Sequence, residues 1–316
     1  MVIQRKELQA RRVIAQALSP SDAMKQLQTA VDVAYHMLAS QAQNYRGSIT
    51  ALALRSQVNE EAVEAAYADY SVVRTWTQRG TIHAICAQDL WLTQVIGARG
   101  LASVAASARR LDIDSGTYED YSRRIIELTM QLRSRDELKT ELGIDASIAS
   151  NLLRRLGRLG LIVQGKKIGR HDSFIATAAL NEITMPEDPI REIVRRYFSS
   201  RGPAQIADCM WWSTLSKTTI AKELDALIST GELLTITCDN KQYYMGRWQE
   251  NVVAKEIDKA LQLTRELPPF DELIMAYTDR DEVFHPQIDR LRVLTKNGLS
   301  WASTLHQAEI IGRVGE

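Results

Sequence analysis

The chain has 316 residues with 39 basic and 39 acidic side chains, so its formal net charge is zero. This balance excludes the whole-protein basic field that is typical of many nucleic-acid-binding proteins, and any such role must come from local clusters of charge. The length favours two or three modest domains or one large one, and 45% apolar with 25% charged residues is ordinary for a soluble globular protein.

The three cysteines, Cys86, Cys209 and Cys238, lie far apart and form no CxxC pair, and the five histidines are scattered. This spacing argues against a disulfide framework and against a zinc site, and it suits a reducing compartment. The charged N-terminal stretch has no apolar signal core, and no apolar run approaches the length of a membrane span. We therefore expect a soluble cytoplasmic protein.

The first helical pattern follows Ser21 and Asp22, either of which can cap a helix. Its apolar residues recur at steps of three and four and so form one buried face: Met24, Leu27, Val31, Ala34 and Leu38. The pattern stops at about Ser40, and two glutamines follow, Gln41 and Gln43.

A composite unit then occurs three times, at residues 48–85, 133–178 and 202–246. Each copy has a helix, a second helix with its own cap, and two β-rich runs on either side of a turn. Helix, turn, helix and hairpin is the winged-helix arrangement, and three copies in one chain predict tandem winged helices. The candidate caps of the second helices are short polar residues: Asn59 in the first copy, Asp145 or Ser147 in the second, and Ser216 in the third.

The remaining segments connect these units. Residues 87–133 have helical patterns, 185–189 (MPEDP) read as a linker, roughly 250–264 as a polar helix, and 293–316 as strands with glycine turns. The expected division is into four parts: 1–110 with the N-terminal helices and first winged helix, 111–185 with the second, 186–250 with the third, and 251–316 with a helix and terminal strands.

A basic cluster covers the second helix and the wing of the second unit. It contains six cations and no acid between residues 151 and 170: Arg154, Arg155, Arg158, Lys166, Lys167 and Arg170. In a winged helix these surfaces meet the major groove and the phosphate backbone, and such a cluster supplies sequence-independent affinity. The alternative is a solvated helix face with a lysine-bearing turn.

Conventional catalytic signatures are missing from the chain. Trp211 and Trp212 are expected in the core, because large aromatic side chains usually serve burial. His83 fits a buried, hydrogen-bonded histidine as well as an active one, and Asp271 and Glu272, after two prolines, can simply cap a helix.

The two glutamines raise a geometric question. In a helix, residues two apart point roughly 200° away from each other, whereas in an extended segment they share one face. If the chain is extended after the helix, the amides of Gln41 and Gln43 converge, and each offers an acceptor oxygen and donor hydrogens without formal charge. Such a pair can hold one water molecule in a fixed orientation.

Several stretches, in order over roughly residues 10–316, resemble one family. They are QAQNYRGS at 41–48, RTWTQRGTIHAI at 74–85, GPAQIADCMWWSTLS at 202–216 and LPPFDELIMAYTDR at 267–280. Together they resemble the bacterial alkylpurine DNA glycosylases of the AlkZ-like superfamily. The resemblance implies a mainly α fold with small β-hairpins, in which tandem winged-helix domains form a C-shaped body with a β-barrel near the C-terminus. The chain reaches only the start of that barrel, Gly312-Arg313-Val314-Gly315, so we expect a partial one with open strand edges.

The family's catalytic motif is Gln-apolar-Gln, or Gln-apolar-Asp in a branch that also unhooks interstrand crosslinks. Gln41-Ala42-Gln43 matches the first form, so the resemblance implies that Gln41 and Gln43 position the attacking water. It further implies double-stranded DNA with alkylated bases as substrate, no cofactor or metal, and a monomer in the cytoplasm, associated with the nucleoid. The expected DNA contacts are Arg46, Arg79, His83, Arg154, Arg155, Arg158, Lys166, Lys167 and Arg170.

Two other interpretations remain at this stage. A winged-helix transcription regulator would use the glutamines only as a helix terminus and would bind a palindromic site as a dimer. Three winged units without an evident dimerisation helix argue against it. The second interpretation is a protein that keeps the fold but has lost catalysis through its short C-terminus.

Overall fold

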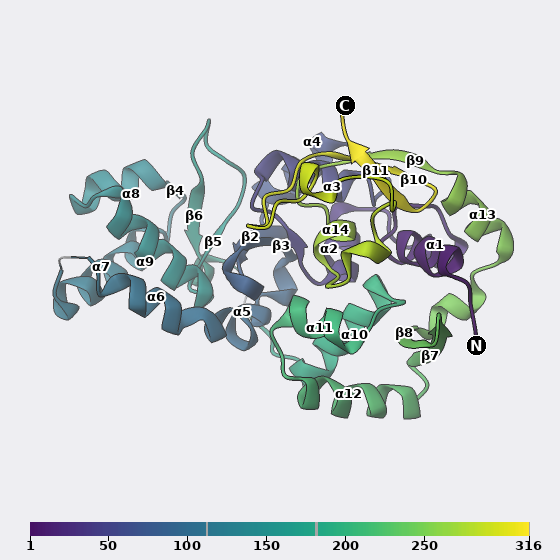
Figure 1. Ribbon diagram of the computed structural model, residues 1–316. Helices are drawn as coiled ribbons and strands as arrows, with labels where there is room; N and C mark the ends of the chain where they lie inside the picture. The colour runs from purple at the N-terminus through teal and green to yellow at the C-terminus, as the bar shows by residue number, and fades with distance from the viewer. Residues whose placement is uncertain (112, 181–182, 316) are drawn as a thin grey trace. The chain divides into compact units, whose positions relative to one another are not determined.

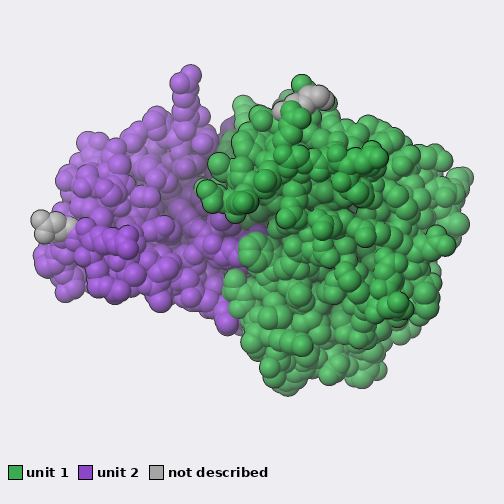
Figure 2. All heavy atoms as spheres, in the orientation of Figure 1, with its two compact units in different colours: residues 1–63, 188–316 green, residues 64–187 purple. Residues whose placement is uncertain are grey.

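The chain folds into two compact units, seen in a computed structural model that describes residues 1–111, 113–180 and 183–315. One unit combines residues 1–63 with 188–316, and the other contains residues 64–187 (Figure 2). The first unit is therefore discontinuous in sequence, because the second is inserted into it. The predicted linker at 185–189 coincides with the point where the chain returns to the first unit.

The N-terminal part of the first unit corrects one expected helix. Ser21 does cap a helix, but that helix is the single 3-10 turn η1 (Asp22–Met24). The α-helix α2 (Ala30–Met37) begins later, because Thr29 and Asp32 form a reciprocal capping box with distances of 3.1 and 2.8 Å. Helix α1 (Arg5–Ala15), which precedes both, packs against α13 (Ala254–Gln262) (Figure 1).

The third predicted unit has its elements where the pattern places them. Helices α11 (Ile206–Ser213) and α12 (Lys217–Ser229) lie beside α10 (Pro189–Arg201) and are followed by the hairpin β7 (Leu233–Cys238) and β8 (Lys241–Gly246) (Figure 1). The backbone N–H of Thr219 donates to Ser216 Oγ at 3.1 Å, which confirms Ser216 as the cap of α12. Trp212 is fully buried as expected, whereas Trp211 is 45% exposed, so the core prediction was wrong for Trp211.

The C-terminal part of the first unit contains a small sheet. Strands β9 (Thr264–Leu267), β10 (Ser303–His306) and β11 (Glu309–Arg313) pair antiparallel in the order β9-β10-β11. The polar helix expected to reach residue 264 ends at 262, and β9 is a strand that the sequence pattern did not predict. The sheet does not close into a barrel within the described residues, so the partial barrel is not confirmed.

One antiparallel sheet forms the centre of the second unit. The predicted hairpin β2 (Val72–Trp76) and β3 (Ile82–Cys86) pairs fully, and so does the later hairpin β5 (Ile162–Gln164) and β6 (Ser173–Ala176). The two hairpins are joined where Arg74 on β2 pairs with Gln164 on β5. With β4 (Arg133–Ser134) the order is β3-β2-β5-β6-β4, so two predicted wings share one sheet.

Helices cover this sheet and continue around the unit. Helix α4 (Glu60–Ala68) leads into it, and the segment expected to be helical contains α5 (Trp91–Val95), α6 (Leu101–Ala108) and α7 (Ser115–Leu128), while its Asp112 lies outside the described residues. Helix α8 (Arg135–Leu142) ends at Gly143, whose φ of 63° suits glycine. Asp145 then caps α9 (Ala146–Arg158) by accepting from two backbone amides at 2.7 and 2.9 Å.

A glycine seats α9 against the sheet. A side chain at Gly157 would lie 2.3 Å from the ring of Trp76 on β2, so only glycine allows this approach. Overall the chain is mainly helical with small antiparallel sheets. None of the helices in the described part of the chain combines the length and apolar character needed to cross a bilayer.

We expect Ser216→Ala to lower the free energy of unfolding by about 1 kcal/mol, because it removes the acceptor at the start of α12. Denaturant unfolding followed by circular dichroism measures the change. Thr218→Ala, an exposed substitution in the same turn, is the control and should leave the midpoint unchanged or slightly raised. An equal loss in both variants would contradict the assignment of Ser216 as the cap.

Candidate functional site

The two glutamines lie outside regular helix. Helix α2 ends at Met37 with Leu38 as its C-cap, Ser40 and Gln41 form the short strand β1 (Ser40–Gln41), and Gln43 occupies a bend before α3 (Tyr45–Ala53). Gln41 is 5% exposed and Gln43 is exposed to solvent. Residues 41–43 are thus not helical, but only Gln41 lies in a strand and the chain bends at Gln43, so the expected extended backbone is present only at the start of the motif. The shared water itself stays a prediction.

The turn that leads into this segment is strained. Leu38 has φ 59° and ψ −49°, a region that residues with side chains rarely adopt. Such a conformation persists only where the surrounding structure holds it. The carbonyl oxygens on either side of Leu38, those of Met37 and Ala39, both accept hydrogen bonds from the guanidinium of Arg201, at 2.8 and 2.5 Å.

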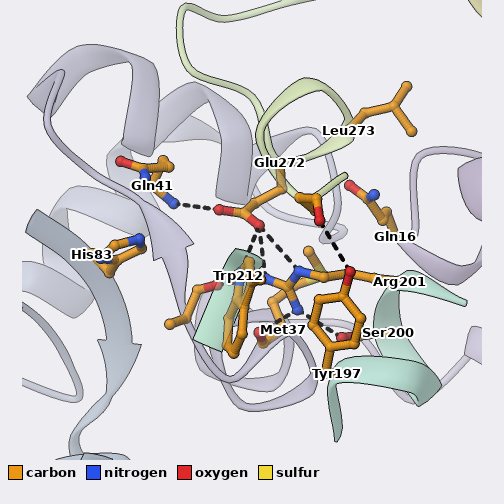
Figure 3. Close-up of polar contacts among 12 residues, drawn as sticks. Gln16, Met37, Gln41, His83, Tyr197, Ser200, Arg201, Trp212, Glu272 and Leu273 are labelled. Carbon is orange, nitrogen blue, oxygen red and sulfur yellow. Dashed lines mark hydrogen bonds and ion pairs between the residues drawn. The ribbon is translucent and has the colours of Figure 1, made fainter. Parts of the chain in front are cut away.

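A buried ion pair holds this guanidinium in place. Arg201, the last residue of α10, donates from Nε and Nη2 to Glu272 Oε2 at 3.1 and 2.9 Å, and the two side chains are 0% and 2% exposed (Figure 3). The other carboxylate oxygen, Oε1 of Glu272, accepts the backbone N–H of Gln41 at 2.9 Å. Glu272, the first residue of α14 (Glu272–Met275), thus connects the ion pair directly to the glutamine segment.

Aromatic side chains enclose the ion pair. The indole N–H of Trp212 donates to Glu272 Oε2 at 3.3 Å, and the guanidinium of Arg201 lies 4.5 Å from the centroid of the same ring. Burial raises the pKa of Tyr197 well above its usual value, and it raises the pKa of Tyr277 to about 12. Both phenols therefore stay neutral donors near pH 7, to the carbonyls of Ala276 at 3.0 Å and of Arg201 at 2.7 Å.

A second buried ion pair lies next to the first in sequence. Asp271 accepts two hydrogen bonds from Arg55, both at 2.8 Å, and it also caps α14 by accepting from the N–H of Leu273 at 2.9 Å. The sequence interpretation of Asp271 as a cap is thus confirmed, although the pairing with Arg55 was not foreseen. Glu272 does more than a cap would, because it reaches the N–H of Gln41.

Three of the six residues of the predicted basic cluster have acidic partners elsewhere in the second unit. Arg155 pairs with Glu119 at 2.8 Å, Lys166 with Glu64 at 3.6 Å, and Lys167 with Asp172 at 3.5 Å. The acid-free run is therefore partly neutralised in space by residues distant in sequence. Arg170 is exposed at the turn of the β5–β6 hairpin, and Arg154 is half-buried on α9.

Arg158 is placed differently from the rest of the cluster. It is 5% exposed, and its Nη1 donates to the carbonyl of Gly97 at 2.8 Å. Burial, together with the charge of Arg154, lowers its pKa. A side chain at Gly100 would overlap this guanidinium. Arg158 thus packs inside the second unit, and we do not include it in a DNA-binding surface.

The other three predicted DNA contacts are divided between the two units. Arg46 is exposed in the first turn of α3, in the first unit. Arg79, with φ 54°, and His83 belong to the β2–β3 hairpin of the second unit. His83 is fully buried, and its Nδ1 lies 2.9 Å from Thr77 Oγ1 and 3.1 Å from the carbonyl oxygen of Thr81.

The sequence analysis missed the groups that hold the glutamine segment. Arg201 was not singled out, and Glu272 was read only as a candidate cap. The available clue was that LPPFDELIMAYTDR and QAQNYRGS carry the same resemblance, which does not say that they touch. Among the described residues, no three His, Cys, Asp or Glu side chains lie close enough together to hold a metal ion.

Comparison with known proteins relates this chain to a family. An interstrand DNA cross-link repair glycosylase from Streptomyces sahachiroi is 24% identical over 281 residues, which cover 81% of this chain and 73% of the relative. The solved structure of Streptomyces sahachiroi DNA glycosylase AlkZ matches the fold with a TM-score of 0.74 at 21% identity, over 98% of this chain and 87% of that one. The family described as DNA glycosylase AlkZ-like matches residues 34–315. With a match that extends over most of its length, this chain belongs to the AlkZ-like DNA glycosylase family.

Proposed function

We propose that this protein is a monofunctional DNA glycosylase that hydrolyses the N-glycosidic bond of purines alkylated at N7 or N3. In this proposal Gln41 and Gln43 orient the water that attacks the anomeric carbon. The observation that carries it is the position of the Gln-Ala-Gln motif: it lies outside helix, on a backbone tied to a buried ion pair. The tandem winged-helix arrangement and a monomeric state are part of the same proposal.

Uncharged amides suit this reaction. A purine alkylated at N7 or N3 is cationic, so its glycosidic bond is already weakened and the departing base needs little help from a general acid. The remaining requirement is to orient water and to favour an oxocarbenium-like sugar, which calls for fixed dipoles more than for a strong base. Gln43 is exposed to solvent, where an incoming substrate can reach it, while Gln41 is buried.

The second unit supplies the proposed sequence-independent contacts to DNA. Arg170, Lys166 and Lys167 lie on the turn of the β5–β6 hairpin, and Arg154 and Arg155 lie on α9. The acidic partners of Lys166 and Arg155 are at exposed or half-exposed sites, where a phosphate can replace a carboxylate at little cost. Arg46 and Arg79 are further candidates, whereas buried His83 would act from inside its hairpin.

A related candidate function is the repair of interstrand crosslinks. It is favoured by the named activity of the Streptomyces relative, which is an interstrand DNA cross-link repair glycosylase. A crosslink through two guanine N7 atoms contains the same cationic purines as a single methyl adduct, so the same water attack would release it. The alternative to an enzyme is a non-catalytic DNA-binding protein, which has weaker support because the family is one of glycosylases.

Gln43→Ala is expected to lower the rate of 7-methylguanine release from methylated duplex DNA by roughly 100-fold, because it removes an oriented dipole at the reacting water. Gln41→Ala should have a smaller effect in the same single-turnover assay, and DNA binding should persist in both variants. Gln57→Ala, an exposed glutamine outside the motif, is the matched control. Full activity in the Gln41→Ala/Gln43→Ala double variant would refute the proposed mechanism.

Removing the positive charge of a side chain that contacts a phosphate should reduce the salt dependence of DNA binding. We expect Arg170→Gln and Lys166→Gln each to lower the slope of log affinity against log salt by about one, with little preference for sequence. Fluorescence anisotropy with an undamaged duplex at several salt concentrations measures the slope. Lys139→Gln on α8 removes a cation outside the proposed surface and serves as the control. Equal slopes for all four proteins would exclude this surface.

Crosslink repair is tested with a duplex joined through two guanine N7 atoms. The wild-type enzyme is expected to convert the crosslinked species into separate strands on a denaturing gel, and Gln43→Ala should not. An enzyme preparation that releases 7-methylguanine but leaves the crosslink intact would restrict the function to single adducts.

A further inference from the structure

We propose that Arg201 and Glu272 are positioning residues for the reaction, which set the place of Gln41 by fixing the backbone of residues 37–41. This inference rests on the proposed role of Gln41 and Gln43 and extends it to two side chains that do not contact the reacting water. In sequence, Arg201 lies 162 residues from Ala39 and Glu272 lies 231 residues from Gln41.

The first argument is the number of backbone groups that the pair holds. Within five residues it engages the carbonyls of Met37 and Ala39 through Arg201, and the N–H of Gln41 through Glu272. All three distances lie between 2.5 and 2.9 Å. Carbonyls at a helix end and in the turn after it lack partners within the helix, and the ion pair supplies hydrogen bonds to them, although the Met37 carbonyl also accepts the N–H of Ala39 at 2.6 Å.

The second argument is the division of labour within the carboxylate. Oε2 of Glu272 takes both donors of Arg201 and the indole N–H of Trp212, which leaves Oε1 for the N–H of Gln41. The carboxylate is thus fixed from one side by three donors and presents its other oxygen in one direction. Because the pair is buried, each charge is costly without the other, and this keeps the two side chains together.

The third argument is the strained residue between the two carbonyls. Leu38 has a positive φ, and Arg201 binds the carbonyl oxygens of the residues before and after it, Met37 and Ala39. Hydrogen bonds on both sides stabilise a conformation that the isolated chain would leave. The turn redirects the backbone from α2 into β1, and the direction of β1 decides where the side chain of Gln41 points.

Small displacements of a positioned group have large effects on rate. A shift of about 1 Å can reduce the rate roughly 100-fold without weakening substrate binding, because the attack geometry is lost. The expected signature of the pair is therefore a lower rate of base release with unchanged DNA affinity.

The test compares Glu272→Gln with Asp271→Asn. Whichever way the amide of Glu272→Gln turns, one set of donors loses its acceptor: either Arg201 and Trp212 or the N–H of Gln41. Asp271→Asn disturbs the neighbouring buried pair with Arg55 in the same way and still caps α14, and the hydrogen bonds described for Asp271 go to Arg55 and Leu273. Both variants leave a buried arginine uncompensated, so their effects on stability should be similar.

The measurements are single-turnover release of 7-methylguanine and the Kd for DNA, at a temperature where both variants keep the wild-type circular dichroism spectrum. We expect Glu272→Gln to be slower by 10-fold or more with its Kd within about twofold of wild type, and Asp271→Asn to stay within about threefold in rate. A wild-type rate for Glu272→Gln, or an equal loss in both variants, overturns the proposal.

A double-variant cycle separates this proposal from the one on which it rests. If Glu272 acts through Gln41, adding Glu272→Gln to Gln41→Ala should slow release by less than about twofold further, whereas independent effects multiply. Multiplicative losses overturn the positioning role. A wild-type rate for Gln41→Ala instead refutes the proposed function, whatever Glu272→Gln does.

A second variant and a measurement on the wild-type enzyme cover the case in which Glu272→Gln does not fold. Arg201→Lys keeps the charge opposite Glu272 but cannot reach Met37, Ala39 and the carboxylate together, so it should show the same slow release. In the wild-type protein the amide hydrogen of Gln41 should exchange as slowly as the core amides of α10. Rapid exchange at Gln41 overturns the proposal without any substitution.

Discussion

The ion pair between Arg201 and Glu272 is the constraint on which the site depends. A carboxylate and a guanidinium with almost no solvent exposure are tolerated only when they neutralise each other and their remaining hydrogen-bonding capacity is used. Here the remaining capacity is used on the backbone around Leu38 and Gln41. The same interaction that makes the burial of two charges possible therefore also determines the course of the chain at the Gln-Ala-Gln motif. Its aromatic enclosure by Trp212 removes competing water and strengthens these contacts.

Local features of the fold could be predicted from the sequence, and features that depend on distant residues could not. Ser216, Asp145 and Gly143 mark helix ends through contacts within a few residues, so their patterns were sufficient. The break between η1 and α2 is also local, but it was not predicted. Two helix caps, Ser21 and Thr29, lie within nine residues, and the apolar spacing continues across Thr29 as if there were one helix. The sharing of one sheet by two hairpins depends on a single pair, Arg74 with Gln164, which no periodicity reveals.

Charge illustrates the same limit at the candidate site. A run of six cations without an acid indicates a positive surface only if no acid folds onto it, and Glu119, Glu64 and Asp172 do so. The motif Gln41-Ala42-Gln43 was identified through a resemblance, and the structure places it outside helix with only its first residue in a strand. The roles of Arg201 and Glu272 could not be predicted, because the residues around them in the sequence indicate only a helix terminus and a helix cap.

The insertion of the second unit into the first has a consequence for biosynthesis. The glutamines are made early, but Glu272 follows Gln41 by 231 residues and Arg201 follows Ala39 by 162. A ribosome therefore completes the whole second unit, residues 64–187, before it supplies either partner of the Gln-Ala-Gln segment. The nascent chain carries the motif without the groups that set its backbone, so the strained turn at Leu38 can form only after most of the protein has been translated.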